Sequence, residues 1–157
     1  KVIASPQTAR IVTVGDAETS GFAPLQRVDL YPAELKFNPC PVDVIVEDAM
    51  TFSVGKLILR AIATPGHSGD HFSYLHLGEQ HLFAGDTVLA GGKVLIQNLP
   101  DVRLDDYRNT IFKLNNLDVA GLLPGHGLIT LARASRHLRA AQASLERFAF
   151  PANGTLD

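Results

Sequence analysis

Residues 57–87, LILRAIATPGHSGDHFSYLHLGEQHLFAGDT, decide the fold of this chain. Three short runs rich in apolar and aromatic residues, at 57–63, 72–77 and 81–83, are separated by glycine-containing turns. The first run is apolar at nearly every position, which is typical of a strand covered on both faces in a layered sheet. The segment therefore predicts neighbouring strands, and two of them lead into a glycine next to a metal-binding side chain.

Strand and helix patterns continue on both sides of this segment. Further short strands are predicted at 2–4, 44–46, 51–54 and 119–123, and helices at 6–12, 105–115 and 131–148. The last helix has apolar residues three and four apart, so one of its faces is expected to pack on a sheet. Residues 13–41, with scattered prolines and glycines, are predicted as a long surface excursion with at most one short helix. The pattern predicts an α/β fold with strands in the middle and helices outside.

Two histidines and one aspartate follow the ends of predicted strands. His67 ends the run TPGH, Asp86 ends AGD and His126 ends LPGH. Proline stops a strand because it lacks the ladder donor, and glycine permits close backbone approach. If the three strands are neighbours with aligned ends, two imidazoles and a carboxylate converge at one edge of the sheet, as a hydrolytic metal site requires. The sequence therefore predicts a shared metal site with His67, Asp86 and His126 as ligands.

Each of these residues also has a purely structural interpretation. A single histidine in a turn is more often a surface group, and a Gly-Asp pair at a strand end is more often an ordinary turn. The combination of three similar contexts favours the metal site. His71 and Asp70 remain candidates for groups that support the ligands. The other histidines and the single cysteine are expected to be exposed, paired or incidental: His76, His81, His137 and Cys40.

Composition places the chain among ordinary globular proteins. Of its 157 residues, 46% are hydrophobic and 19% are charged, with a formal net charge of −2. Lys and Arg are scattered, and no apolar run approaches the roughly 20 residues of a membrane span, so neither a nucleic acid nor a membrane is expected as partner. Lys1 leads directly into a predicted strand and is expected not to be the biological start. The compartment stays open, with the cytoplasm slightly favoured.

Residues 43–148 resemble the C-terminal part of a metallo-β-lactamase-fold hydrolase, in the branch with glyoxalase II-like and lactonase-like enzymes. The motifs TPGHS, GDT and PGHG and the last helix carry this resemblance. It implies a four-layer αββα sandwich and a dinuclear site, with zinc as the expected metal and iron or manganese as alternatives. In that site His67 binds one metal, Asp86 bridges both and His126 binds the other.

Two departures from the family narrow the expected substrate. Asp86 stands where class B1 or B2 β-lactamases place a cysteine, which argues against antibiotic hydrolysis. Residues 88–92, VLAGG, lack the Gly-Arg that glyoxalase II-like sequences carry after the bridging aspartate, so a glutathione thioester is not favoured. The resemblance implies a metal-dependent hydrolase of a small-molecule ester, lactone, thioester or amide, with Asp86 as the catalytic residue that passes a proton to the leaving group.

The most diagnostic motif of the family, His-x-His-x-Asp-His, occurs nowhere in this chain. Residues 1–157 are therefore expected to form a single partial domain that lacks the N-terminal part of the sandwich and is incomplete or inactive by itself. The sheet face without a partner layer predicts association with the missing segment or with a second copy in a homo-oligomer. Two alternatives stay open: an iron-dependent oxidoreductase on the same fold, and a non-catalytic, metal-poor binding or assembly module.

Overall fold

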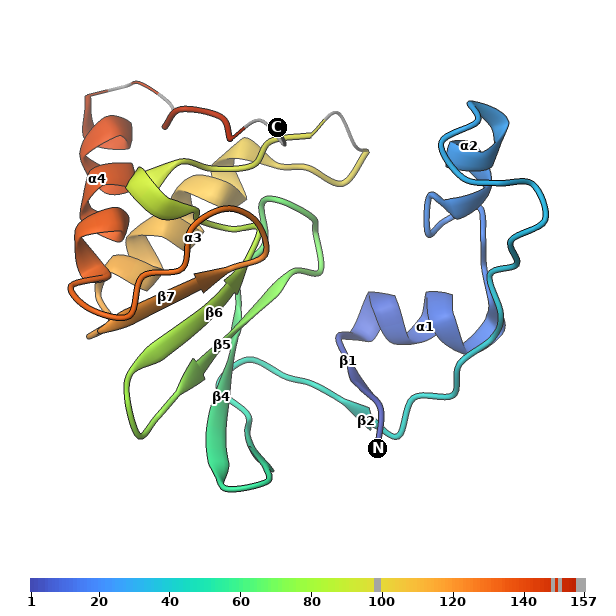
Figure 1. Cartoon of the computed structure of the whole chain (residues 1–157), viewed down its shortest axis with the longest axis horizontal. Helices are drawn as coiled ribbons and strands as arrows, with labels where there is room; N and C mark the ends of the chain where they lie inside the picture. The colour runs from blue at the N-terminus through green and yellow to red at the C-terminus, as the bar shows by residue number, and fades with distance from the viewer. Residues whose placement is uncertain (98–99, 148, 150, 155–157) are drawn as a thin grey trace. The chain divides into compact units, whose positions relative to one another are not determined.

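The computed structural model describes residues 1–97, 100–147, 149 and 151–154. They divide into two compact units, residues 1–47 and residues 48–157 (Figure 1). Each unit has its own sheet and its own helices. The sequence predicts a single partial domain, and this division into two units leaves that as a prediction.

The first unit joins two short parallel strands to a helix. β1 (Ile3–Ala4) pairs with β2 (Val44–Ile45). α1 (Pro6–Val14) starts at a proline, whose fixed φ suits the first helical position, and is slightly longer than predicted. It ends where Gly15 takes a left-handed φ of 68°. α2 (Phe22–Arg27) is the one short helix of the predicted surface excursion.

A five-stranded sheet forms the second unit. Its strand order is β3-β4-β5-β6-β7, antiparallel except for the parallel pair β6-β7. The strands are β3 (Thr51–Val54), β4 (Leu57–Ala63), β5 (Phe72–His76), β6 (His81–Gly85) and β7 (Gly121–Pro124). Because β5 is antiparallel to both of its neighbours, β4, β6 and β7 run in one direction and end at the same edge of the sheet.

Two helices, α3 (Leu104–Asn115) and α4 (Ser135–Glu146), pack on one face of this sheet. The predicted apolar stripe of α3 is buried, since Tyr107, Ile111 and Leu114 are at most 1% exposed. The core that the helices share with the sheet includes the strand residues Ile62, Leu75, Leu82, Ala84 and Leu122. A short 3-10 helix, η1 (Ala90–Gly92), lies between β6 and α3 in the sequence. This arrangement confirms the predicted α/β fold class.

The helix predicted for residues 131–148 is shorter than expected. It begins only at Ser135, because Arg133 has a left-handed φ of 57°, which a right-handed helix does not admit. Leu131 is therefore 63% exposed instead of packed on the sheet. Phe148, at the predicted end of the helix, lies outside the described residues.

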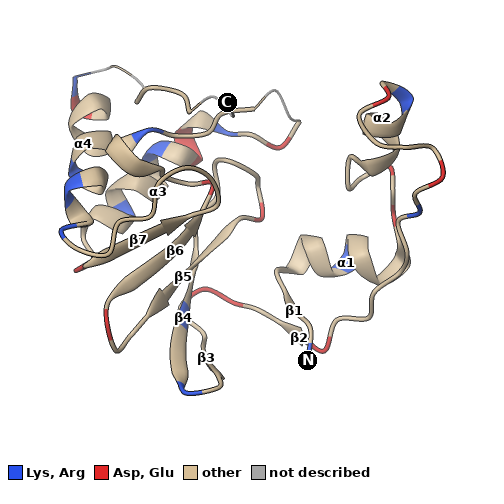
Figure 2. Cartoon of the chain, viewed as in Figure 1, with Lys and Arg blue, Asp and Glu red and all other residues tan. Residues whose placement is uncertain are grey.

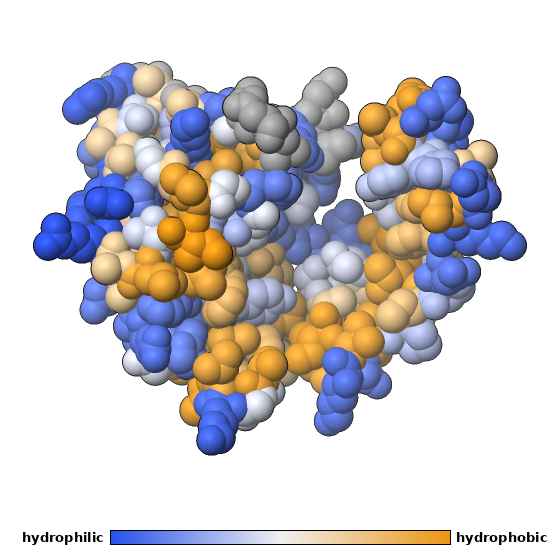
Figure 3. Space-filling model, in the orientation of Figure 1, coloured by the Kyte–Doolittle hydropathy of each residue, from blue (hydrophilic) through white to orange (hydrophobic). Residues whose placement is uncertain are grey.

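The expectation that β4 is covered on both faces fails for its first half. Leu57 is 40% exposed and Ile58 is 51% exposed, whereas Ala61 and Ile62 are buried. Both residues pair with the edge strand β3, and the ladder with β5 begins at Leu59, although Ile58 O also accepts the Leu77 N–H at 3.0 Å. Figure 3 shows hydrophobic side chains on the surface of this hairpin.

Charged residues are spread over both units. Lys and Arg are interspersed with Asp and Glu along the chain, and α4 carries Arg136 and Arg139 (Figure 2). The expectation that the chain has no nucleic-acid partner stays a prediction. In the described part of the chain, no helix combines the length and the apolar character needed to cross a membrane.

Candidate functional site

The three predicted ligand residues lie together at one edge of the five-stranded sheet. His67, Asp86 and His126 follow β4, β6 and β7, which all end at this edge. Asp86 is central, since its Oδ2 is 3.5 Å from His67 Nε2 and its Oδ1 is 2.7 Å from His126 Nδ1. The structure thus brings together all three side chains that the sequence expects to converge, while their role as metal ligands stays a prediction.

Glycines make room for these contacts. A Cβ at Gly125 would lie 2.5 Å from Asp86 Oδ1, so a side chain at this position would displace the carboxylate. Gly85, with a φ of +53°, lies close to the ring of His71, since an added Cβ would be 2.5 Å from His71 Nε2. The glycines of the two motifs therefore permit the close approach of functional groups.

A backbone carbonyl orients the ring of His67. Its Nδ1 lies 2.7 Å from Leu95 O. Because a carbonyl oxygen only accepts hydrogen bonds, Nδ1 carries the proton, and in the neutral ring the lone pair of Nε2 faces Asp86 Oδ2. Two acceptors repel each other, and a metal cation between the two atoms would relieve this repulsion. Metal-binding histidines are commonly fixed by a carbonyl in this way.

His126 is the most accessible member of the cluster. Its side chain is 46% exposed, compared with 12% for His67 and 20% for Asp86. The loop that carries it continues with three apolar residues that are strongly exposed: Leu128 (76%), Ile129 (61%) and Leu131 (63%). Figure 3 shows hydrophobic surface over this loop. The site is therefore open on the His126 side, next to an apolar surface.

The donors suit a metal ion by type, but they form only part of a ligand set. Two imidazoles and a carboxylate are ligands that zinc and iron centres use. Among the described residues, however, no group of three or more His, Cys, Asp or Glu side chains is placed so that it could hold a metal ion. Asp86 and His126 instead share a direct hydrogen bond. A complete metal site would need further ligands than these residues supply.

His71, one of the two residues kept as supporting candidates, contacts the backbone of Asp86. Its Nε2 accepts the Asp86 N–H at 3.3 Å, and its Nδ1 lies 2.8 Å from Thr64 Oγ1 and 3.0 Å from Thr87 Oγ1. Burial, together with the nearby ring of His67, lowers the pKa of His71 to about 4. His71 is thus a neutral, half-buried ring that contacts the backbone of Asp86.

Tyr107 also belongs to the site, which sequence reasoning missed. Its hydroxyl donates to Asp86 O at 2.7 Å and accepts the Leu95 N–H at 3.2 Å. Burial raises the pKa of Tyr107, so the hydroxyl keeps its proton. The sequence predicts Tyr107 only as part of an apolar stripe, and that pattern is the same whether or not the hydroxyl has a partner.

His137 was expected to be exposed or paired, and the structure shows it buried and paired, at 7% exposure. Its Nδ1 accepts the Gly91 N–H at 2.9 Å, and its Nε2 lies 3.1 Å from Thr130 Oγ1. His137 therefore links α4 to η1 and to the loop that carries His126. Burial lowers its pKa, and the charge of Arg136 lowers it further.

The other candidates have contacts elsewhere in the two units. The carboxylate of Asp70, the second supporting candidate, acts on Tyr74, whose pKa is raised first by burial and then by this charge. His81 Nδ1 lies 3.6 Å from Glu79 Oε2. Cys40 is an exposed free cysteine. None of these contacts joins the residue to the Asp86 cluster.

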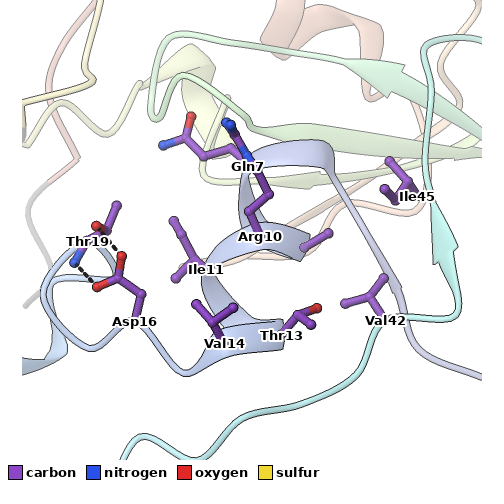
Figure 4. A pocket seen from close by; sticks show the side chains of 10 residues that line it. Gln7, Arg10, Ile11, Thr13, Val14, Asp16, Thr19, Val42 and Ile45 are labelled. Atoms are coloured by element: carbon purple, nitrogen blue, oxygen red, sulfur yellow. Dashed lines mark hydrogen bonds between the residues drawn. The ribbon is translucent and has the colours of Figure 1, made fainter.

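The first unit contains a pocket, but its ionisable groups do not form a comparable cluster. The pocket, of about 860 Å³, is lined mainly by α1 and by residues near β2 (Figure 4). Of its lining residues, Arg10 and Asp16 are ionisable. Asp16 bonds the N–H and the hydroxyl of Thr19 at 3.0 and 2.6 Å, and these bonds lower the pKa of Asp16. The pocket therefore lies in the first unit, whereas the cluster of His67, Asp86 and His126 lies in the second unit.

Comparison with known proteins identifies similar sequences and folds. A family model described as the metallo-beta-lactamase superfamily matches residues 6–126. The atrochrysone carboxyl ACP thioesterase of Aspergillus fumigatus is 35% identical over 94 residues, or 60% of this chain and 28% of that protein. The beta-lactamase-like protein 2 homolog of Caenorhabditis elegans is 37% identical over 82 residues, or 52% of this chain and 26% of that protein.

A solved structure extends the comparison to almost the whole chain. A metallo-beta-lactamase family protein from Thermus thermophilus aligns with a TM-score of 0.69 and 19% identity, over 94% of this chain and 53% of that one. The matches thus span about a quarter of the two curated relatives and about half of the solved structure. The chain corresponds to a part of each of these proteins.

Proposed function

This chain belongs to the metallo-beta-lactamase superfamily, and on this premise we propose that it is part of a metal-dependent hydrolase of small-molecule carbonyl compounds. Its own contribution to the metal site is the imidazoles of His67 and His126 and the carboxylate of Asp86. The remaining ligands come from outside residues 1–157, either from further polypeptide or from an associated copy. Zinc is the proposed metal, with iron as the second candidate.

The convergence of the three side chains on one edge carries this proposal. They come from the ends of three strands that run in the same direction, and one carboxylate contacts both rings. In open α/β sheets, ligands bind outside the carboxyl ends of the strands. The acceptor atoms His67 Nε2 and Asp86 Oδ2 face each other at 3.5 Å, and a metal cation between them would make this contact favourable.

The residues of the chain have separate tasks in the proposed reaction. A bound divalent metal would polarise the substrate carbonyl and acidify an attacking water. His67, fixed through its Nδ1 by Leu95 O, offers Nε2 in a constant direction. Asp86 takes up a proton from the attacking water on one carboxylate oxygen and delivers it to the leaving group. His126 holds the exposed side of the site, where the substrate enters.

A thioester is the proposed substrate among the ester, lactone, thioester and amide classes. The relative from Aspergillus fumigatus is named a thioesterase. The exposed apolar residues Leu128, Ile129 and Leu131 follow His126 directly and suit the hydrocarbon part of an acyl group. Because a thiol leaves more readily than an alkoxide or an amine, proton delivery from Asp86 matters least for a thioester and most for an amide.

Metal content and hydrolysis of one preparation test this proposal. The chain is stripped with a chelator, reloaded with Zn²⁺ or Fe²⁺, desalted, and analysed for metal per chain and for hydrolysis of an acyl-coenzyme A thioester. We expect Asp86→Asn to weaken metal binding by at least about 100-fold, because changes around metal ligands alone already cost 10–100-fold. The matched control is Asp118→Asn, which changes an exposed aspartate of the same unit.

The same measurement separates the alternatives. Metal binding with thioester cleavage supports the hydrolase, whereas binding of iron in preference to zinc favours an oxidoreductase. Near-zero metal per chain, with folding unaltered after chelation, would overturn the proposal and favour a metal-poor binding or assembly module.

We further propose that the sheet face opposite α3 and α4 is covered in the functional protein by a further segment or a second copy. Side chains alternate along strands, so Tyr74 and Phe83, which pair across β5 and β6, lie on this face. Phe83 is 37% exposed, and the ring of Tyr74 contacts Phe52 at 5.8 Å in a T-shaped arrangement. Sedimentation of the chain tests this idea, because a monomer at micromolar concentration would rule out the homo-oligomer.

A further inference from the structure

We propose that His71 and Tyr107 are positioning residues that hold the backbone of Asp86 from two sides and so fix its carboxylate between His67 and His126. The two contacts occupy both polar backbone groups of Asp86, because His71 accepts its N–H and Tyr107 donates to its C=O. This inference rests on the proposed function, in which Asp86 is the residue shared by both imidazoles.

The contact on the N–H side fixes the tautomer of His71. A backbone N–H only donates, so the Nε2 of this ring is unprotonated and the proton lies on Nδ1. Nδ1 faces the hydroxyls of Thr64 and Thr87 at 2.8 and 3.0 Å. Thr64 Oγ1 also lies 3.0 Å from Ser73 Oγ, which donates to Ala84 O at 3.2 Å. Thr64, Ser73 and Thr87 are all 0% exposed, so a buried hydrogen-bond network holds the ring.

The contact on the C=O side extends to His67. The Tyr107 hydroxyl donates to Asp86 O and accepts the N–H of Leu95, whose carbonyl lies 2.7 Å from His67 Nδ1. Tyr107 is 1% exposed and packs directly against Gly66, where an added Cβ would lie 2.6 Å from Tyr107 Cα. One buried hydroxyl therefore contacts both Asp86 and the residue that orients His67.

These contacts matter because Asp86 lies where a strand gives way to a loop. The preceding Gly85 has a left-handed φ of +53°, a conformation that glycine adopts without strain but does not enforce. With its N–H bonded to the half-buried ring of His71 and its C=O bonded to the buried Tyr107, the backbone of Asp86 is restrained, and its carboxylate moves mainly through its own side-chain torsions. The distances from its two oxygens to His67 and His126 are then set together. Both residues bond the backbone of Asp86 and neither bonds its carboxylate oxygens, so they act by positioning it.

The tautomer of His71 gives a first test that needs no metal. The chain is labelled with ¹⁵N-histidine, and the ring nitrogens are assigned by long-range ¹H–¹⁵N correlation. We expect His71 as the Nδ1–H tautomer, with Nε2 unprotonated. The Nε2–H tautomer would overturn the proposal, because that ring cannot accept the Asp86 N–H.

Variants then separate positioning from general stability. Tyr107→Phe removes one hydroxyl, His71→Ala removes the ring, and His71→Gln keeps an acceptor near the place of Nε2. The matched control, Tyr74→Phe, removes a phenol hydroxyl that lies on the other face of the sheet. Each variant is examined for Zn²⁺ affinity by calorimetry, for the His126 Nδ1–H resonance by NMR, and for its thermal midpoint.

We expect Tyr107→Phe and His71→Ala to weaken Zn²⁺ binding by about 10-fold or more, the usual effect of losing a group that orients a ligand. Both should shift or lose the His126 resonance, His71→Gln should restore part of the affinity, and Tyr74→Phe should change neither. Unchanged affinity and an unchanged His126 resonance in folded Tyr107→Phe would overturn the proposal. If the unaltered chain binds no Zn²⁺, the proposed function fails, while the tautomer and the His126 resonance still decide whether Asp86 is held in this way.

Discussion

The sheet edge of the second unit and the pocket of the first unit are built in opposite ways. At the edge, Asp86 and His67 are held by the half-buried ring of His71, the buried Tyr107 and the carbonyl of the buried Leu95. Around the pocket, apolar residues are left open, with Val14 70% exposed and Ile45 53% exposed. Converging polar groups supported by a packed core, and not the size of the hollow, therefore mark the candidate site in this chain.

The same contrast appears in the packing behind each region. The buried hydrophobic residues of the first unit are small, namely Ala4, Ala9 and Val46. The second unit buries large side chains from α3, α4 and the sheet in one cluster, among them Tyr107 and Leu138. A rigid site needs such support, since small displacements of a ligand cost much of its affinity.

The largest expected effect on stability comes from replacing one isoleucine by alanine in each of the two units. Ile111→Ala removes a side chain that is 0% exposed, so the second unit should lose about 2–5 kcal/mol of unfolding free energy. Ile11→Ala, at the half-buried wall of the pocket, should cost the first unit no more than about 1 kcal/mol. Urea titration with hydrogen exchange of peptides from each unit measures both. Equal losses would show that the two units are packed alike.

The sequence predicts those features of the two units that depend on the periodicity of apolar residues. The period of α3 places Tyr107, Ile111 and Leu114 on its buried side, and the structure agrees. The start of the last helix is predicted wrongly, because residues 131–134 continue the apolar period while Arg133 takes a left-handed φ. The period of a sequence reports which face is apolar and does not report where the backbone leaves the helix.

The candidate site, too, can be predicted from the sequence only in part. The convergence of His67, Asp86 and His126 is foreseeable, because each follows a strand end and carries a residue type with metal-binding chemistry. The support by Tyr107 and His137 is not, because it depends on which carbonyl or hydroxyl comes within hydrogen-bond reach in the folded chain. Such contacts join residues far apart in the sequence, for example Gly91 and His137.

Smaller effects are expected from two glycine-to-alanine substitutions, one that disturbs the geometry of the site and one that strains the backbone. Gly125→Ala places a Cβ against Asp86 Oδ1 without a left-handed φ, so it should weaken Zn²⁺ binding by about 10-fold, as for other changes around a ligand. Gly21→Ala, in the first unit, meets no atom within 4 Å but has a φ of +82°, so it should cost about 1 kcal/mol of stability. Calorimetry with Zn²⁺ and thermal unfolding of both variants give the comparison. A normal affinity in Gly125→Ala would mean that the Asp86 carboxylate does not need its present position.

The smallest expected effect is a dependence on pH that only the second unit should show. All six histidines of the chain follow residue 47, so the first unit has no group of this kind. His137 is buried, and burial together with the charge of Arg136 holds its pKa below the ordinary value of 6.5. The unfolded chain therefore binds a proton near pH 6.5 that the folded unit still rejects. This stabilisation is fully present above pH 6.5 and is lost as the pH falls through the lower folded pKa.

The contacts of His137 indicate what protonation would break. Its Nδ1 accepts the Gly91 N–H, but both ring nitrogens of a protonated histidine are donors. Protonation would therefore break this hydrogen bond between η1 and α4. Replacing the ring by His137→Gln removes the titration, and the loss of thermal stability between pH 7 and pH 5 should become shallower in the second unit only. Hydrogen exchange of peptides from both units at pH 7, 6 and 5 measures this slope. A slope that is the same in the variant would assign the pH dependence to the other histidines, and a comparable slope in the first unit would contradict the contrast between the two units.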